Sequence, residues 1–297
     1  MQNKIDRVFQ NLINYFLIKK KRKLYKLFFF IFKNFIKGPF IINFQYYKFY
    51  SYPQKKSLSR WMLKNLKPWD LNTVNLINNL LGNDNSLFID CGANYGAYSI
   101  PISKKKPNAT IICFDPSKSA LSELKNNIQL NKSKNIKYYD YGISDKISKA
   151  FFSDNISNFN NSGEYSFNRL KFSYKVNTIT LDNFLENFNI KIYKKIVIKL
   201  DVEGYEFKAL VGMKNLLLNN DVIIFFEFSR MLLRKKTFNF KKLKKFMDFY
   251  KLYLLDLNFN LINIKDILYK FSKLEKKKNT IGDYILVKNS FYKKNIR

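Results

Sequence analysis

Two short motifs in this chain of 297 residues combine the residue types and spacing that ligand binding and catalysis require. The first is LFIDCGANYG at residues 87–96, where an apolar run ends in Asp90 and a turn with Gly92 and Gly96 follows. A strand, a turn and a helix in this order place a carboxylate and bare backbone N–H groups at the mouth of a parallel sheet. Proteins of the α/β class bind small ligands at that place.

The spacing of the glycines indicates which ligand the first motif would hold. A dinucleotide fingerprint G-x-G-x-x-G that starts at Gly92 needs glycine at the positions of Asn94 and Ala97. A side chain at the middle position obstructs the approach of the backbone to a pyrophosphate. The turn therefore favours S-adenosylmethionine, which has no pyrophosphate, and it argues against a nicotinamide-dependent oxidoreductase.

Two further positions extend the predicted cofactor site. Asp115 ends the next apolar run, where a carboxylate can accept both hydroxyls of a ribose, or can cap the helix that starts near Pro116. Ser144 follows the third strand, where an adenine ring would lie, although a plain β-turn explains the same residues. The predicted cofactor-binding residues are Asp90, Gly92, Ala93, Asn94, Gly96, Asp115 and Ser144.

The second motif, KLDVEGYE at residues 199–206, carries the predicted catalytic residues. Because strand side chains alternate, Lys199, Asp201 and Glu203 share one face. A solvated strand end explains such charges in most sequences, but the apolar strand before Asp201 argues for burial, and buried charge clusters gather at functional sites. We predict that these three residues are catalytic. Glu227 ends another apolar strand. It is either a third acidic side chain in the wall of the predicted pocket or a buried carboxylate whose hydrogen bonds are satisfied within the protein.

The absence of histidine narrows the chemistry, because histidine is the commonest general base and the commonest metal ligand. A base must then be Asp, Glu, Lys or Tyr. We predict no metal, although Asp201, Glu203 and Glu227 together could hold a divalent ion. Cys91 and Cys113 fall in predicted buried strands, which indicates a reducing, cytoplasmic location without a disulfide framework.

Net charge is +32, from 54 basic and 22 acidic residues, and indicates an anionic partner such as nucleic acid or a membrane surface. Codon bias is the alternative explanation of this charge, because Lys, Asn, Ile, Phe and Tyr have A/T-rich codons.

We predict a basic, Phe-rich helical extension over residues 1–60. Residues 19–36 join a Lys/Arg cluster to an apolar run of six residues, well short of the roughly 20 that cross a bilayer. They predict either peripheral membrane contact or a helix packed on the domain. Basic residues of a predicted helix over 230–250 present the same choice between a solvated face and an anionic lipid or polysaccharide.

Alternating apolar runs and helical patterns predict a doubly wound, mostly parallel sheet with helices on both faces over residues 61–297. Predicted strands cover 87–90, 109–115, 136–141, 195–201, 222–228, 252–257 and 284–287. One predicted helix contains the apolar positions from Val74 to Leu81, and the next begins at residue 97. Further predicted helices cover 117–130, 206–218 and 230–250, and a loop is predicted at 153–170.

These motifs together resemble the FkbM family of S-adenosylmethionine-dependent methyltransferases. The likeness is carried by FIDCGANYG at 88–96, FDP at 114–116, GISD at 142–145, TITLDNF at 178–184, KLDVEGYE at 199–206 and IIFFE at 223–227. The resemblance implies a Rossmann-like class I methyltransferase fold with a seven-stranded sheet. It also implies methylation of a hydroxyl on a sugar, glycan or other small acceptor. The chain departs from the family at Asp115, where Glu is frequent, and at Cys91, where Val is frequent.

Two other functions remain open from the residues. The positive charge suggests a nucleic-acid methyltransferase, but none of the six prolines is followed by the Pro or Cys that such enzymes often carry. A nucleic-acid partner is therefore disfavoured. A non-catalytic membrane-surface protein on the same fold would require both motifs to be vestigial.

Overall fold

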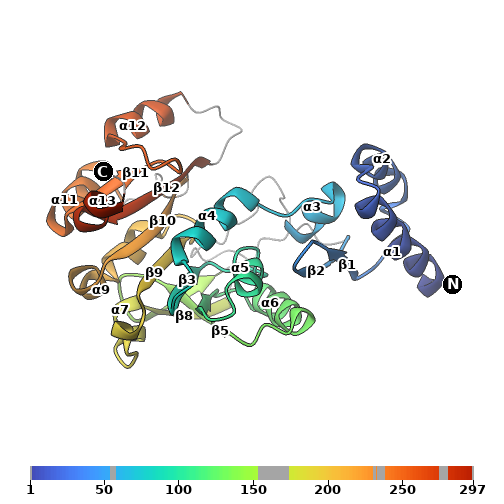
Figure 1. Cartoon of the computed structure of the whole chain (residues 1–297), viewed down its shortest axis with the longest axis horizontal. Helices are drawn as coiled ribbons and strands as arrows, with labels where there is room; N and C mark the ends of the chain where they lie inside the picture. Colours follow the sequence, from blue (N-terminus) through green and yellow to red (C-terminus); the bar gives the residue numbers. More distant parts are fainter. Residues whose placement is uncertain are drawn as a thin grey trace.

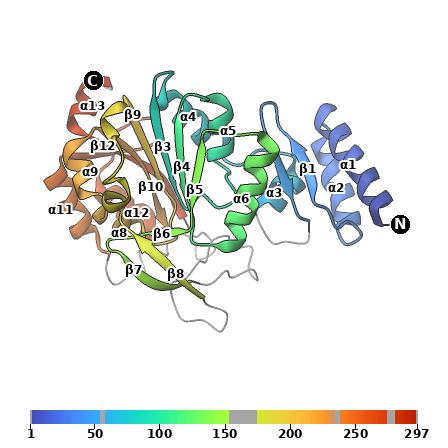
Figure 2. The same ribbon diagram turned by 90° about the horizontal axis from the view of Figure 1, so that it is seen from below.

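A computed structural model describes residues 2–53, 58–152, 174–229, 232, 238–273 and 280–295. Its centre is a seven-stranded sheet with helices on both faces (Figures 1 and 2). In spatial order the strands are β11 (Leu252–Leu255), β12 (Thr280–Lys288), β10 (Val222–Ser229), β9 (Lys195–Leu200), β3 (Ser86–Cys91), β4 (Thr110–Phe114) and β5 (Ile136–Tyr139).

Five strands of this sheet, from β10 to β5, pair in parallel, and β12 runs antiparallel between β10 and β11. The predicted class I methyltransferase fold is confirmed. The order of the strands reverses between β3 and β9, because the chain first builds β4 and β5 on one side and later builds β10 on the other. In open α/β sheets ligands bind at such a switch point, outside the carboxyl ends of the strands.

Alternation along the strands explains why both faces are covered. Phe88 packs into one apolar cluster with helices α4 (Leu71–Leu81), α5 (Ser99–Lys105) and α6 (Lys118–Asn131). Leu87 and Ile89 pack into another with α8 (Glu206–Val211), α9 (Lys214–Asn219) and α11 (Phe240–Tyr250).

Two predicted elements differ in the structure. The prediction of one helix over 206–218 is wrong, because the helix is interrupted at Gly212, between α8 and α9. A Cβ at Gly212 would lie 2.1 Å from the carbonyl oxygen of Ser144, so the break lets two distant segments meet. The strand predicted to end at Tyr141 ends at Tyr139. The predicted loop 153–170 lies outside the described residues, as does most of 230–237.

A second sheet, which the sequence did not predict, has the order β6 (Tyr141–Ile143), β8 (Tyr174–Ile179) and β7 (Ser148–Phe152). After β8, Thr180 caps α7 (Leu181–Leu185). Asp182 accepts hydrogen bonds from the backbone N–H groups of Asn215 and Leu216 at the start of α9, both at 2.9 Å. The motif TITLDNF thus builds a structural corner.

The N-terminal part contains helices α1 (Gln2–Ile18) and α2 (Arg22–Phe32), a hairpin of β1 (Phe40–Asn43) and β2 (Lys48–Ser51), and α3 (Leu58–Asn65). Figure 1 shows α1 and α2 at one end of the molecule, with the hairpin between them and the sheet. The hairpin is fixed to α6, where Asn127 and Asn131 accept from the N–H groups of Tyr50 and Lys48.

The chain closes with α12 (Ile264–Ser272) and α13 (Asn289–Asn295), and a short 3-10 helix covers Ile190–Ile192. Within the described ranges, no helix is both long enough and apolar enough to cross a membrane.

Candidate active site

The two predicted motifs meet at the switch point of the sheet. Gly92 follows β3 and Asp201 follows β9, and the N–H of Asp201 donates to the carbonyl of Cys91 at 3.0 Å. A Cβ at Gly92 would lie 1.9 Å from the carbonyl oxygen of Asp201, and Gly92 has a φ of +86°. Only glycine permits this approach, so Gly92 joins the turn of residues 92–96 to the motif at residues 199–206.

The backbone N–H groups of the turn are already used by the protein. Those of Gly92 and Ala93 donate to the carbonyl of Phe114 at 2.8 and 3.0 Å, and that of Asn94 donates to Asp115 at 2.8 Å. The next two donate to the Asn94 side chain and the Ala93 carbonyl. The expectation of bare N–H groups is therefore wrong. A turn without free donors does not suit a phosphate, in agreement with the reading of the glycine spacing.

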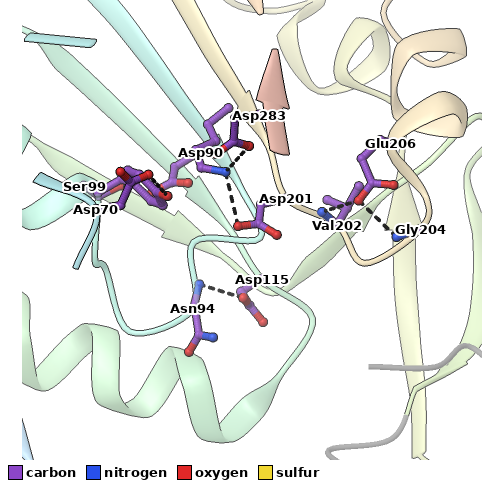
Figure 3. Close-up of polar contacts among 12 residues, drawn as sticks. Asp70, Asp90, Asn94, Ser99, Asp115, Asp201, Val202, Gly204, Glu206 and Asp283 are labelled. Atoms are coloured by element: carbon purple, nitrogen blue, oxygen red, sulfur yellow. Dashed lines mark hydrogen bonds and ion pairs between the residues drawn. The ribbon is translucent and has the colours of Figure 1, made fainter. Parts of the chain in front are cut away.

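Asp115 connects the end of β4 to this turn. One carboxylate oxygen accepts from the N–H of Asn94 at 2.8 Å (Figure 3). The other accepts from the N–H of Ser117, also at 2.8 Å. Ser117, and not Asp115, caps α6 by accepting from the N–H of Ala120. These contacts hold the Asp115 carboxylate beside the turn, at the end of β4, which is compatible with a ribose role.

Asp90 is buried and accepts from the hydroxyl of Ser99 at the start of α5. Burial raises the pKa of Asp90 to about 6, although the Ser99 hydroxyl and the Lys199 ammonium oppose the rise. Its Oδ1 atom has no hydrogen-bond partner among the described residues. Ser144 is also buried, and its hydroxyl donates to Asp145 at 3.0 Å.

Lys199 lies among carboxylates at the end of β9. Its side chain is 1% exposed, and its Nζ is 3.2 Å from Asp201 Oδ2 and 3.7 Å from Asp283 Oδ1. Figure 3 labels Asp201 and Asp283, and a dashed line ends at the carboxylate of each. Burial lowers the pKa of Lys199, but Asp201 and Asp283 outweigh burial and hold that pKa well above its usual value. Lys199 therefore stays protonated and cannot be a general base.

The sequence did not predict three members of this cluster. Asp283 lies on β12 opposite Glu227 on β10. The ring of Tyr98 lies 4.7 Å from Lys199 Nζ, and its hydroxyl donates to Asp70 at 2.9 Å. One signal was available for Asp283, which directly precedes the predicted strand 284–287. In a strand that runs antiparallel to β10, the first residues lie at the ligand-binding edge.

The loop after β9 is held in an unusual conformation. Glu203 has a φ of +53°, which is rare for a residue with a side chain and recurs at functional sites. Glu206 is buried and accepts from the N–H groups of Val202 and Gly204 at 3.2 and 3.0 Å. Glu206 therefore fixes the loop that carries Asp201 and Glu203.

Burial and mutual repulsion raise the pKa of several of these carboxyls. The pKa of Glu203 is raised well above its usual value by burial and then by Asp201 and Glu227. Burial raises the pKa of Glu206 to about 7, and burial with Asp201 raises that of Glu227. Such an excess of carboxyls suits a ligand that brings positive charge or hydrogen-bond donors. Across the described part of the chain, no group of three or more His, Cys, Asp or Glu is arranged to hold a metal ion.

Comparison with known protein families shows which family has this arrangement of motifs. A family model of the Methyltransferase FkbM domain matches residues 90–261, more than half of the chain. The chain belongs to the FkbM methyltransferase family. The predicted family is thus confirmed, and membership agrees with S-adenosylmethionine as the cofactor. The match contains both motifs apart from the first residues of the strand before Asp90.

Individual relatives of this FkbM protein are distant. Methyltransferase 1 of Beauveria bassiana (strain ARSEF 2860) is 24% identical over an alignment of 149 residues, which covers 44% of this chain and 59% of that relative. The structure of M. jannaschii TYW2 in complex with AdoMet is 13% identical, covers 84% of each chain and has a TM-score of 0.38. Magnesium protoporphyrin IX methyltransferase (ChlM) from Synechocystis PCC 6803, with bound SAM, is 11% identical over 77% of this chain and 84% of that chain, with a TM-score of 0.39. Likenesses this weak carry no argument about the substrate.

Proposed function

We propose that this FkbM protein is an S-adenosylmethionine-dependent methyltransferase that methylates a hydroxyl group of a sugar or glycan-type small acceptor. The observation that carries the proposal is the junction of the two motifs. The backbone of Gly92 lies against the carbonyl of Asp201. The turn of residues 92–96, here called the cofactor turn, and residues 201–206, here called the acidic loop, therefore border one site.

The residues of the turn fit the proposed cofactor. S-adenosylmethionine brings a positive sulfonium, an ammonium group and ribose hydroxyls, and when bound it supplies an activated methyl group. The residues beside the turn offer hydrogen-bond acceptors, among them Asp115 after β4 and the unpartnered Oδ1 of Asp90 on β3. We assign the ribose hydroxyls to Asp115 and the amino-acid end of the cofactor to the side of Asp90.

The carboxylates of the acidic loop would take up the proton of the acceptor hydroxyl. In the transfer, a carbon–oxygen bond forms as the carbon–sulfur bond breaks, and the hydroxyl proton passes to Glu203. The raised pKa of Glu203 makes its ionised form a stronger base than an ordinary carboxylate. Asp201, paired with Lys199 at 3.2 Å, would accept a hydrogen bond from the acceptor and hold it in place.

The charge of this site favours a neutral, hydroxyl-rich acceptor over nucleic acid. A phosphodiester would add negative charge beside the Asp201 carboxylate and beside Glu203 and Glu227, whose pKa values burial and Asp201 already raise. Sugar hydroxyls bring no charge and can donate hydrogen bonds to these carboxyl groups. The excess of lysines elsewhere on the chain does not change the charge at the reacting atoms.

The proposal is tested by transfer of labelled methyl groups from S-adenosylmethionine to a panel of glycans, with RNA and DNA oligonucleotides as the competing acceptors. Glu203→Gln should slow transfer at saturating cofactor by about 10²-fold or more, while the dissociation constant of the cofactor stays within about twofold. Asp201→Asn should act in the same direction. The wild-type rate should rise with pH through the raised pKa of Glu203, because the base must be ionised.

Glu186→Gln, an exposed Glu at the end of α7, is the matched control and should transfer at the wild-type rate. Wild-type turnover by both Glu203→Gln and Asp201→Asn would show that the acidic loop is not catalytic. Methylation of oligonucleotides in preference to glycans would overturn the acceptor class alone.

A further inference from the structure

Helix α2 is apolar on two sides, although the protein covers only one of them. Tyr25 and Phe29 are buried, at 0% and 2% exposure. Leu24, Leu27 and Ile31 recur at helical spacing on another face and are 54%, 59% and 54% exposed. An amphipathic helix on a soluble domain normally turns polar residues outward, so packing within the chain does not account for this second face.

The exposed apolar surface continues from α2 onto α1. Phe30 and Phe35 are 67% and 65% exposed, and Phe35 borders a groove of about 390 Å³ between the two helices. Apolar side chains line this groove, with Lys4 as the charged residue at its edge. Val8 of α1 lines it as well and is 60% exposed. We call Leu24, Leu27, Phe30, Ile31 and Phe35 the N-terminal apolar surface.

Basic side chains surround this surface. Residues 4–37 contain ten Lys or Arg and one carboxylate, Asp6, which accepts from the backbone N–H of Lys37. Lys19 to Lys23 are consecutive basic residues in the turn before α2 and its first residues, and all are exposed. Lys33 Nζ lies 4.6 Å from the centre of the Phe30 ring, so its charge sits at the edge of the apolar surface.

We propose that α1 and α2 dock this protein on the surface of an anionic lipid bilayer. The apolar side chains would enter the boundary between headgroups and acyl chains, and the lysines would contact anionic headgroups. Figures 1 and 2 show the helix pair at the far end of the molecule from α9 and α11, where a flat surface can reach it. The charge complementarity identifies the lipid, because a second copy of this chain would bring the same ten positive charges against themselves.

Sedimentation of full-length protein with vesicles tests the proposal. Phosphatidylcholine vesicles with and without 30% phosphatidylglycerol are compared at low and high salt. Two variants address the two parts of the surface: Leu27→Gln with Ile31→Gln removes apolar contact, and Lys21→Gln with Lys23→Gln removes charge. Each lysine removed should weaken partition into anionic vesicles about fivefold, and the apolar pair should weaken it at least tenfold.

Matched controls lie at the opposite end of the molecule. Leu218 of α9 and Phe249 of α11 are 55% and 70% exposed, so Leu218→Gln with Phe249→Gln makes an equal apolar change. Lys241→Gln with Lys242→Gln on α11 makes an equal charge change. Both control pairs should partition like the wild type, and thermal unfolding checks that every variant is folded.

Binding to anionic vesicles that high salt reverses, weakened by both test pairs and by neither control pair, supports the proposal. Three results would overturn it. The wild type could fail to sediment with either vesicle, or the control pairs could weaken partition as much as the test pairs, which would assign binding to overall charge. Light scattering could instead show a dimer that Leu27→Gln with Ile31→Gln dissociates, which would assign the apolar surface to a second copy.

Discussion

Glu206 allows the burial of the acidic loop to be measured without any ligand. Its pKa rises from an ordinary 4.5 to about 7 on folding because the side chain is fully buried. Below the unfolded pKa both states are protonated and the stabilising effect of the proton is complete. It is lost as pH rises through the folded pKa, because the unfolded state ionises first. At about 1.4 kcal/mol per pKa unit, this carboxyl removes about 3 kcal/mol of stability between pH 4 and pH 8.

Glu206→Gln isolates this effect, because glutamine keeps an acceptor for the N–H groups of Val202 and Gly204 but does not ionise. Urea unfolding should show nearly equal stability of variant and wild type near pH 4. At pH 8 the variant should be more stable by about 3 kcal/mol. The exposed control Glu186→Gln should follow the wild type throughout. Parallel curves for Glu206→Gln and wild type would show that Glu206 is not buried as an acid, and the assignment of its role in the loop would fail.

Two other predictions concern stability. Gly92→Ala should lose at least about 2 kcal/mol more than Gly82→Ala in urea unfolding. Both glycines have positive φ, but a Cβ at Gly92 meets the Asp201 carbonyl, whereas one at Gly82 meets no described atom within 4 Å; equal losses would contradict the close junction of the motifs. Asp283→Asn should lower the free energy of unfolding by about 1–2 kcal/mol, because it removes one negative charge beside the buried Lys199 ammonium. Asp248→Asn should lower it by less than about 0.5 kcal/mol, because the ion pair of Asp248 with Lys244 is exposed. A larger loss for Asp248→Asn, whose pair is the shorter at 2.9 Å, would show that distance outweighs burial here.

Much of the sheet could be predicted from the sequence because its strands are short apolar runs with local boundaries. The run before Asp90 and the run before Asp201 became β3 and β9, and their charged ends lie together because both strands are parallel neighbours. The order of elements along the chain was therefore enough to bring Asp90, Lys199 and Asp201 into one region.

What the sequence did not predict depends on contacts between distant segments. The N–H groups of Gly92 and Ala93 are used by the carbonyl of Phe114, which no local pattern indicates. At the helix break, the carbonyl of Ser144 lies against Gly212, and the carbonyl of Gly212 accepts from the N–H of Asp182. Asp283 reaches Lys199 only through the register of β12 against β10. The second sheet was missed for a different reason, because the alternation of apolar and polar residues in Tyr174–Ile179 is weak.

Calorimetric titration of S-adenosylmethionine into the wild type, Asp115→Ala and Glu203→Gln tests the central claim most directly, because it needs no knowledge of the acceptor. The wild type should bind, Glu203→Gln should bind with an unchanged dissociation constant, and Asp115→Ala should bind more than tenfold more weakly, a loss of more than about 1.4 kcal/mol. Absence of binding by the folded wild type, or equal affinity of Asp115→Ala and wild type, would contradict the assignment of the cofactor to the turn between β3 and α5.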